Sequence, residues 1–135
     1  MTLPSNSAVD PEEPARVIIV EDEPLVAENL RDDLVEAGFD VVGVAPRVES
    51  ALKLIERTGF DVAILDANLA GTSAAPAAAA LSARGLPFMV LSGYAREQLQ
   101  REFSEAVYIQ KPYRVRKLID ALNSLLHKQR DRGAS

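Results

Sequence analysis

Five short apolar segments recur along the chain, and each has the composition of a β-strand that is buried on both faces of a sheet. Apolar residues dominate these segments, and the β-branched residues valine and isoleucine are frequent in them, as buried parallel strands require. The predicted strands are residues 16–20, 41–44, 61–65, 86–91 and 106–109. Pro87 lies near the start of the fourth segment, which is where a strand tolerates proline.

Between the predicted strands, apolar residues recur every three or four positions, which is the spacing of one face of an α-helix. Pro24 suits the first turn of the first helix, where its missing N–H costs nothing, and Gly38 can end that helix. Pro76 is tolerable only in the first turn of the alanine-rich helix over 74–83, which Thr72 or Ser73 could cap. The remaining expected helices are one from Val48 that closes at Gly59, a short polar helix over 96–102, and a last helix with an apolar stripe at Val115, Leu118, Ile119, Leu122, Leu125 and Leu126.

The segments that leave the first two helices resemble each other. They read Gly38-Phe39-Asp40 and Gly59-Phe60-Asp61, and an apolar strand follows each of them. We interpret them as the same αβ corner used twice, in which the glycine ends the helix and the phenylalanine packs under the turn.

The regular alternation of strand and helix defines the fold class. It implies a parallel sheet with helices on both faces and right-handed crossovers. The predicted fold is α/β, a doubly wound (βα)5 five-stranded parallel sheet with the flavodoxin-like strand order 2-1-3-4-5. Residues 15–127 are expected to form this domain, after a flexible leader over residues 1–14 and before a charged tail over residues 128–135.

Composition narrows the class of protein further. A chain of 135 residues can form one domain with a proper core. It contains no cysteine, which excludes disulfides, thiolate metal sites and cysteine nucleophiles. The net charge of −5 argues against non-specific binding to nucleic acid. A membrane span and a signal peptide are both missing from the pattern, so no membrane partner and a cytoplasmic location are expected.

Polar side chains of complementary chemistry follow four of the five predicted strands. They are Glu21 and Asp22 after the first strand, Asp66 after the third, Ser92 after the fourth and Lys111 after the fifth. The carboxyl ends of parallel strands meet at one edge of the sheet, where open α/β folds bind ligands. Crowded carboxylates repel one another unless a cation lies among them, and Mg²⁺ prefers hard oxygen ligands. A lysine and a hydroxyl beside them suit phosphoryl transfer onto an aspartate.

Each of these residues could instead have an ordinary structural role. Asp22 or Glu23, beside Pro24, could cap the helix that follows, and Asp66 could cap the turn at Asn68. Ser92 could be a helix cap, and Lys111 could belong to a plain loop. The conjunction of suitable residues at four strand ends favours the chemical interpretation, in which Asp66 accepts a phosphoryl group.

Four motifs at these strand ends resemble one known family. They are Ile-Ile-Val-Glu-Asp-Glu-Pro (18–24), Ile-Leu-Asp-Ala-Asn-Leu-Ala-Gly (64–71), Leu-Ser-Gly-Tyr (91–94) and Lys-Pro-Tyr (111–113). Over residues 16–127 the chain resembles the receiver domain of bacterial two-component response regulators, the CheY-like superfamily. By this resemblance Asp66 is the phosphoacceptor, and Mg²⁺ is held by Glu21, Asp22, Asp66 and the backbone carbonyl of Asn68. It also implies that Lys111 contacts the phosphoryl group and precedes a cis bond to Pro112, that Ser92 is the switch hydroxyl and that Tyr108 is the switch aromatic.

The chain departs from the usual family pattern near the fourth predicted strand. Residues 87–94 resemble the Pro-Phe-x-Phe-Ala-Thr-Gly-Tyr motif of stand-alone receivers from α-proteobacteria, with Met-Val-Leu-Ser in place of its middle part. The usual Pro-Gly after the phosphoacceptor is Ala70-Gly71, and the third helix with its loops is short. Gly93 stands where the family usually has alanine, so we expect a loose region around the fourth helix.

The resemblance implies a single-domain response regulator. Its phosphoryl donor would be a histidine kinase or a histidine phosphotransfer protein, and the phosphorylated form would bind a partner, relay the group or act as a sink. A downstream protein is expected on the face formed by the fourth helix, fifth strand and last helix, near Tyr94, Tyr108 and Tyr113. Nucleic acid is not an expected partner, and the chain is not expected to be an enzyme on a separate substrate.

Two other functions and one other residue remain open. A pseudo-receiver would bind proteins without cycling phosphate, although the set formed by Glu21, Asp22, Asp66 and Lys111 argues against it. A phosphatase with a covalent aspartyl intermediate would typically carry Asp-x-Asp after its first strand and a cap domain. In this chain the nucleophile would instead follow the third strand, and the residue two positions later is Asn68. His127 could be a phosphotransfer histidine, or it could cap the carboxyl end of the last helix.

Overall fold

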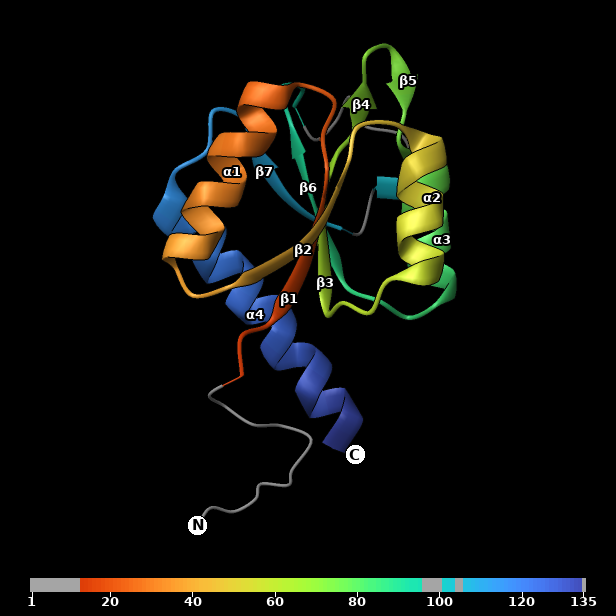
Figure 1. The fold of residues 1–135 in the computed structure, drawn as a ribbon. Helices are drawn as coiled ribbons and strands as arrows, with labels where there is room; N and C mark the ends of the chain where they lie inside the picture. The colour runs from red at the N-terminus through yellow and green to blue at the C-terminus, as the bar shows by residue number, and fades with distance from the viewer. Residues whose placement is uncertain (1–12, 96–100, 104–105, 135) are drawn as a thin grey trace.

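The computed structural model describes residues 13–95, 101–103 and 106–134. Most of the chain in these ranges lies in helices and strands (Figure 1). In chain order the elements are β1 (Arg16–Val20), α1 (Pro24–Glu36), β2 (Asp40–Ala45), α2 (Val48–Arg57), β3 (Val62–Asp66), β4 (Asn68–Leu69), β5 (Thr72–Ser73), α3 (Ala75–Ala83), β6 (Phe88–Ser92), the 3-10 helix η2 (Arg101–Phe103), β7 (Val107–Gln110) and α4 (Val115–Ala134).

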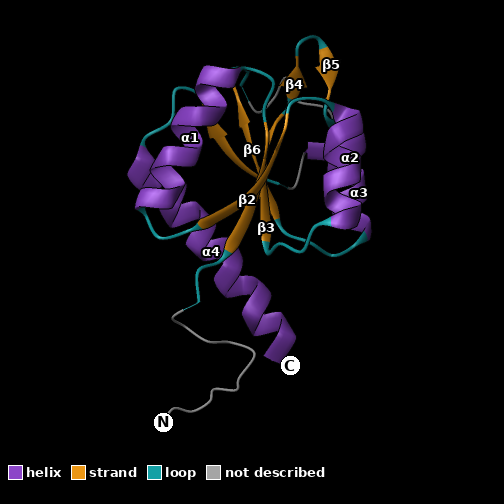
Figure 2. Ribbon diagram, in the orientation of Figure 1, coloured by secondary structure: helices purple, strands orange, loops and turns teal. Residues whose placement is uncertain are grey.

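Five of the strands form one sheet in the order β2-β1-β3-β6-β7. Every neighbouring pair in it is parallel. Because β6 and β7 are the predicted fourth and fifth strands, the predicted order 2-1-3-4-5 is confirmed, and so is the α/β class. Helices α1 and α4 cover one face of the sheet, and α2 and α3 cover the other (Figure 2).

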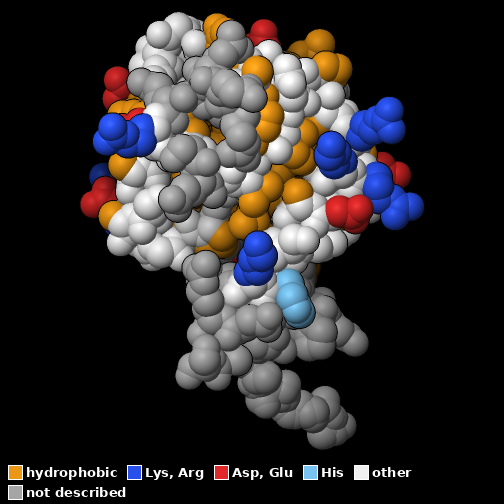
Figure 3. Space-filling view, turned by 180° about the vertical axis from the view of Figure 1, so that it is seen from behind, with side chains coloured by type: hydrophobic (Ala, Val, Ile, Leu, Met, Phe, Trp, Pro, Cys, Tyr) orange, Lys and Arg blue, Asp and Glu red, His pale blue; other side chains and the backbone are white. Residues whose placement is uncertain are grey.

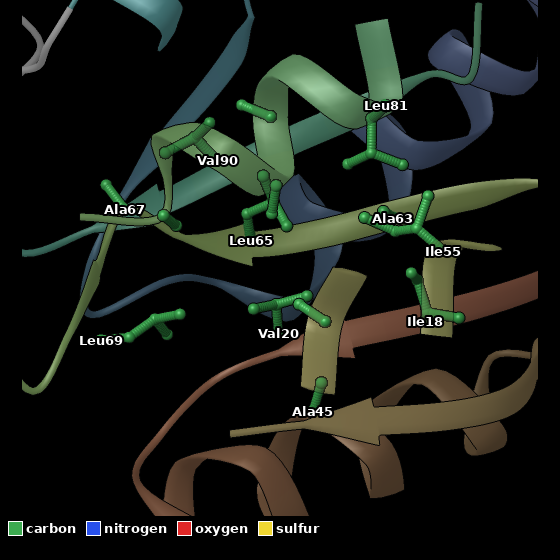
Figure 4. Close-up of a cluster of buried hydrophobic side chains, with 14 of the residues drawn as sticks. Ile18, Val20, Ala45, Ile55, Ala63, Leu65, Ala67, Leu69, Leu81 and Val90 are labelled. Atoms are coloured by element: carbon green, nitrogen blue, oxygen red, sulfur yellow. The ribbon is translucent and has the colours of Figure 1, made fainter. Parts of the chain in front are cut away.

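Two hydrophobic clusters lie on the two faces of the sheet, and the strands contribute alternate residues to each. On β3, Ala63 and Leu65 face the cluster that includes α2 and α3 (Figure 4). Val62 and Ile64 belong to the cluster that includes α1 and α4. All of β3 is therefore buried, and it is the central strand of the sheet.

The two αβ corners that look alike in sequence differ in structure. Gly38 ends α1 in the left-handed region, with φ of 99°, and its N–H donates to the Val35 carbonyl over 3.0 Å. At the second corner Thr58 is extended, and Gly59 is not among the glycines with positive φ. Phe39 and Phe60 are both buried, but on opposite faces of the sheet. The prediction of one corner used twice is wrong, because α1 and α2 approach the sheet from opposite sides.

A small antiparallel hairpin follows β3 and was not apparent from the sequence. In it β4 pairs with β5 around Ala70 and Gly71, which have φ of 54° and 89°. The predicted cap of the next helix is present in modified form. Ser73 Oγ accepts a hydrogen bond from the Ala75 N–H over 3.0 Å, although the N-cap position itself is Ala74.

The last helix is longer than its apolar stripe predicts. Helix α4 continues to Ala134, through most of the segment expected to be a charged tail, and its end projects beyond the sheet (Figure 1). The predicted fourth helix lies mostly at residues 96–100, outside the described residues, and residues 101–103 form a 3-10 turn that buries Phe103. Among the helices of the described ranges, none combines the length and the apolar character that crossing a membrane requires.

Candidate functional site

Three of the predicted site residues reach the same side of the sheet because of the strand period of two. Glu21 follows Val17 and Ile19, Asp66 follows Val62 and Ile64, and Lys111 follows Val107 and Ile109 at this interval. The earlier residues of all three series belong to or pack against the cluster beneath α1 and α4. The three charged side chains are therefore delivered to one place at the carboxyl edge of the sheet.

The acidic residues form a tight cluster at this edge. One carboxylate oxygen from each of Glu21, Asp22 and Asp66 lies within 4.8 Å of the others. Glu21 is 2% exposed and Asp66 is 8% exposed, so two of the three carboxylates are buried. The donors are all hard oxygens, and among the described residues no histidine belongs to the cluster. This donor set fits Mg²⁺, which binds few carboxylates together with water and phosphate oxygens.

Lys111 neutralises part of this charge. Its Nζ donates to Asp66 Oδ2 over 2.8 Å and to Glu21 Oε1 over 3.0 Å. Burial by itself would lower the pKa of Lys111, but the hydrogen bonds and charges of Asp66 and Glu21 outweigh burial and raise it. Burial is also the largest influence on Glu21 and raises the pKa of that carboxyl; the Lys111 hydrogen bond opposes this rise and the Asp66 charge adds to it.

The backbone holds the two buried carboxylates in place. The Asn68 N–H donates to Asp66 Oδ1 over 3.0 Å, and the Glu23 N–H donates to Glu21 Oε2 over 3.2 Å. The turn-capping role considered for Asp66 is thus present together with the lysine contact. The Asn68 side chain is used elsewhere, since its Oδ1 accepts from the Gly71 N–H over 2.7 Å and closes the β4–β5 turn.

Ser92 ends β6 on the opposite face, in step with Phe88 and Val90, and it is 1% exposed. Its Oγ accepts a hydrogen bond from the Tyr94 N–H over 3.0 Å. The Tyr108 hydroxyl donates to the Tyr94 carbonyl. Both residues predicted to act in switching therefore contact the main chain of the same residue.

The segment after β7 adds a feature that the sequence did not reveal. The Lys111–Pro112 bond is cis, as predicted, and the Lys111 N–H donates to the Ser92 carbonyl over 2.8 Å. The Tyr113 hydroxyl donates to Asp33 Oδ2 on α1 over 2.8 Å. Tyr113 and Asp33 lie 80 positions apart in the sequence, and no sequence pattern pairs them. The helical pattern shows only that Asp33 is the neighbour of Leu34, which faces the core.

A family model for the response regulator receiver domain matches residues 17–123, most of the chain. The chain belongs to this family. The receiver fold is shared with many solved structures, including a CheY-like receiver from Methanospirillum hungatei, at 25% identity and a TM-score of 0.76. Receivers are signalling modules that generally bind Mg²⁺ at an acidic pocket, and in this chain Glu21, Asp22 and Asp66 form an acidic cluster.

Individual relatives place the receiver among response regulators. The chain is 30% identical to the transcriptional regulatory protein PdtaR of Mycobacterium tuberculosis, over 97% of its own length and 65% of that protein's. It thus spans about 65% of this relative. SdrG from Sphingomonas melonis is 37% identical with a TM-score of 0.74, covering 84% of this chain and 98% of SdrG. PhyR from Brucella abortus is 28% identical with a TM-score of 0.75, covering 90% of this chain and 51% of PhyR.

The structure also decides one secondary prediction. His127 is exposed and lies within α4, which ends only at Ala134. It is therefore not in the last turn of the helix, and the capping role is wrong, because the helix continues through the polar residues that follow its apolar stripe.

Proposed function

We propose that this receiver is a phosphoacceptor of a two-component or phosphorelay system, with Asp66 as the acceptor. The observation that carries the proposal is the contact of one lysine, Lys111, with two buried acids, Asp66 and Glu21, at the edge of the sheet. The donor would be a phosphohistidine on a kinase or a phosphotransfer protein. An Asp66 carboxylate oxygen forms a bond to phosphorus, the bond from phosphorus to the imidazole nitrogen breaks, and the imidazole leaves with that electron pair.

Lys111 and the acidic cluster would divide the remaining work. Lys111 Nζ already lies 2.8 Å from Asp66, so it can contact the phosphoryl oxygens once the carboxylate has become an acyl phosphate. Glu21, Asp22, Asp66 and the carbonyl of Asn68 would hold Mg²⁺, which supplies charge neutralisation for the transferred group when bound. Asp66 and the neighbouring Glu21 are both buried, which limits the access of bulk water to the acceptor.

Ser92 and Tyr108 would report phosphorylation to a partner. The Ser92 hydroxyl accepts from the Tyr94 N–H, which leaves its own proton available for a phosphoryl oxygen. Any shift of Ser92 then acts on the Tyr94 main chain, which Tyr108 also contacts. The downstream surface we propose includes β7 and α4; the back of the molecule carries a band of hydrophobic side chains with lysine and arginine beside it (Figure 3).

We propose that the chain belongs with the stand-alone receivers that the motif at residues 87–94 resembles, and it matches 98% of the SdrG chain. SdrG in a BeF3-activated conformation is 38% identical to this chain, with a TM-score of 0.71. Whether the receiver then switches a partner, relays the group or drains it is decided by its cognate proteins. We propose that the receiver itself is cytoplasmic.

The test compares Asp66→Asn with Asp61→Asn. Asp61 precedes the same strand and lies at the opposite edge of the sheet, where it pairs with Arg16. Incubation with a small phosphodonor such as acetyl phosphate and Mg²⁺ should add the mass of one phosphoryl group to the parent and to Asp61→Asn, and none to Asp66→Asn. A chelator should abolish the gain.

The same experiment separates the alternative of a pseudo-receiver. A protein-binding module that does not cycle phosphate would show no mass gain with any donor, including cognate kinases. Labelling of Asp66→Asn as strong as that of the parent would show that the acceptor is another residue. Equal labelling in chelator would remove the proposed role of Mg²⁺.

A further inference from the structure

Tyr113 connects two segments that lie far apart in the sequence. Its ring is partly buried and packs against the hydrophobic cluster beneath α1 and α4. Its hydroxyl donates to Asp33 Oδ2 over 2.8 Å. Burial, and then the neighbouring Asp33 carboxylate, raise the pKa of the phenol, which is therefore protonated and a donor throughout the neutral range.

One of the two segments carries the lysine of the site. The Lys111 N–H is fixed by the Ser92 carbonyl at the end of the sheet, but Pro112 has no N–H to offer and α4 begins only at Val115. The connection between β7 and α4 is therefore short, and beyond Lys111 it takes no part in the hydrogen-bond ladder of the sheet. Tyr113 gives this connection a side-chain attachment two residues after Lys111.

The other segment carries the acids. Glu21 and Asp22 lie just before α1, separated from it by the N-cap residue Glu23, and Asp33 lies on that helix. The Tyr113–Asp33 hydrogen bond thus joins the helix that follows the acidic pair to the loop that carries the ammonium group. Both residues also line a groove of about 750 Å³ that extends to Lys111, so the bond lies beside the site and not remote from it.

We propose, on the basis of the function proposed above, that Tyr113 and Asp33 are positioning residues whose hydrogen bond holds Lys111 against Asp66 for phosphoryl transfer. Neither residue touches the reacting atoms. Lysine has a long, flexible side chain, so fixing the backbone on both sides of Lys111 narrows the positions that its Nζ can reach. Loss of the hydrogen bond should lower the rate of Asp66 phosphorylation about 3- to 10-fold, the effect of one hydrogen bond, because the ring packing remains.

The experiment uses Tyr113→Phe, Asp33→Ala, the double variant that combines these two, and Asp33→Asn in the full chain, with Asp32→Ala as the matched control. Asp32 is the neighbouring carboxylate on α1 and is exposed. The rate of mass gain with acetyl phosphate and Mg²⁺ is measured at several donor concentrations, and thermal unfolding is recorded for each variant. Tyr113→Phe is then repeated in a Lys111→Ala background.

Tyr113→Phe and Asp33→Ala should slow phosphorylation equally and together no more than singly. Asp33→Asn should keep the parental phosphorylation rate because its amide oxygen still accepts a hydrogen bond from Tyr113. Asp32→Ala should also keep the parental rate. In the Lys111→Ala background Tyr113→Phe should have no further effect, whereas a purely structural role predicts the same loss in both backgrounds. If the Lys111→Ala variant does not fold, the comparison of Asp33→Asn with Asp33→Ala alone tests the positioning role.

Two failures can be told apart. A parent that gains no phosphoryl group overturns the proposed function, and the positioning role falls with it. A parent that is phosphorylated while Tyr113→Phe keeps the parental rate overturns only the positioning role. Slowing by Asp33→Asn equal to that by Asp33→Ala also overturns it.

Discussion

The charge balance of the acidic cluster predicts that two substitutions at contacting residues have very different effects on stability. At an effective dielectric constant of about 20, two carboxylates at the limiting separation of 4.8 Å repel each other by about 3.5 kcal/mol. The Lys111–Asp66 contact at 2.8 Å attracts by about 6 kcal/mol on the same scale, and the Lys111–Glu21 contact at 3.0 Å by nearly as much.

Lys111→Met removes both attractions and leaves the carboxylates facing one another. Breaking a buried ion pair from one side typically costs about 3–5 kcal/mol, and we expect a loss in that range when no metal is present. Asp66→Asn removes one attraction of about 6 kcal/mol but also two repulsions that total about 7 kcal/mol. These nearly cancel, so Asp66→Asn should stay within about 1 kcal/mol of the parent.

The assay is urea unfolding followed by circular dichroism at pH 7 in chelator, with Lys117→Met as the control for loss of an exposed lysine on α4. Lys117→Met should be nearly neutral. A loss below about 1 kcal/mol in Lys111→Met, the value of an exposed ion pair, would refute the reasoning. Equal destabilisation by Lys111→Met and Asp66→Asn would refute it as well, because the carboxylates would then not be repelling one another.

Three further predictions concern stability. Mg²⁺ at about 100 times its Kd should raise the free energy of unfolding by about 2.7 kcal/mol in a thermal melt, and Asp22→Ala should remove most of this gain. Gly38→Ala should lower the free energy of unfolding by about 1 kcal/mol, because the backbone there has φ of 99°, although an added Cβ would meet no other atom. Gly93→Ala also has room for the Cβ and does not have positive φ, so it should raise the free energy of unfolding by about 0.4–1 kcal/mol in urea unfolding. Since folding raises the pKa of Tyr113, the contribution of this residue to stability is complete below the ordinary pKa of 10.0 and is lost as the pH rises towards the folded value. Above pH 10.0 the free energy of unfolding should therefore fall less steeply with pH in Tyr113→Phe than in the parent, and an equally steep fall would contradict this.

The sheet and the edge that carries the acids were predictable because local pattern determines both. The apolar run before Asp66 can be buried only as a strand covered on two faces, and the structure buries all of β3. Once the strands are parallel, their ends must meet, and Asp66 and Lys111 do meet there although 45 positions separate them. The contact required no knowledge of the loops between them.

The features that the sequence did not predict depend on partners that are distant or on backbone angles. The β4–β5 hairpin requires positive φ at Ala70, and alanine gives no signal for that conformation. The different corners at Gly38 and Gly59 follow from which face of the sheet each helix covers, which identical local residues cannot specify. The Tyr113–Asp33 bond exists only after α1 and the segment before α4 have packed on the same face.

The strand period of two that brings Glu21, Asp66 and Lys111 together also limits where this receiver can accept the insertion or deletion of a residue. Substitution of Val62 or Ile64 by another apolar residue leaves Asp66 where it is. One residue inserted within β3 would instead turn the aspartate toward α2 and α3, away from Lys111. Insertions and deletions should therefore be tolerated in the connections between elements and excluded from β1, β3 and the start of the segment after β7, so that a library of single-residue insertions should separate into silent and inactive variants along these boundaries.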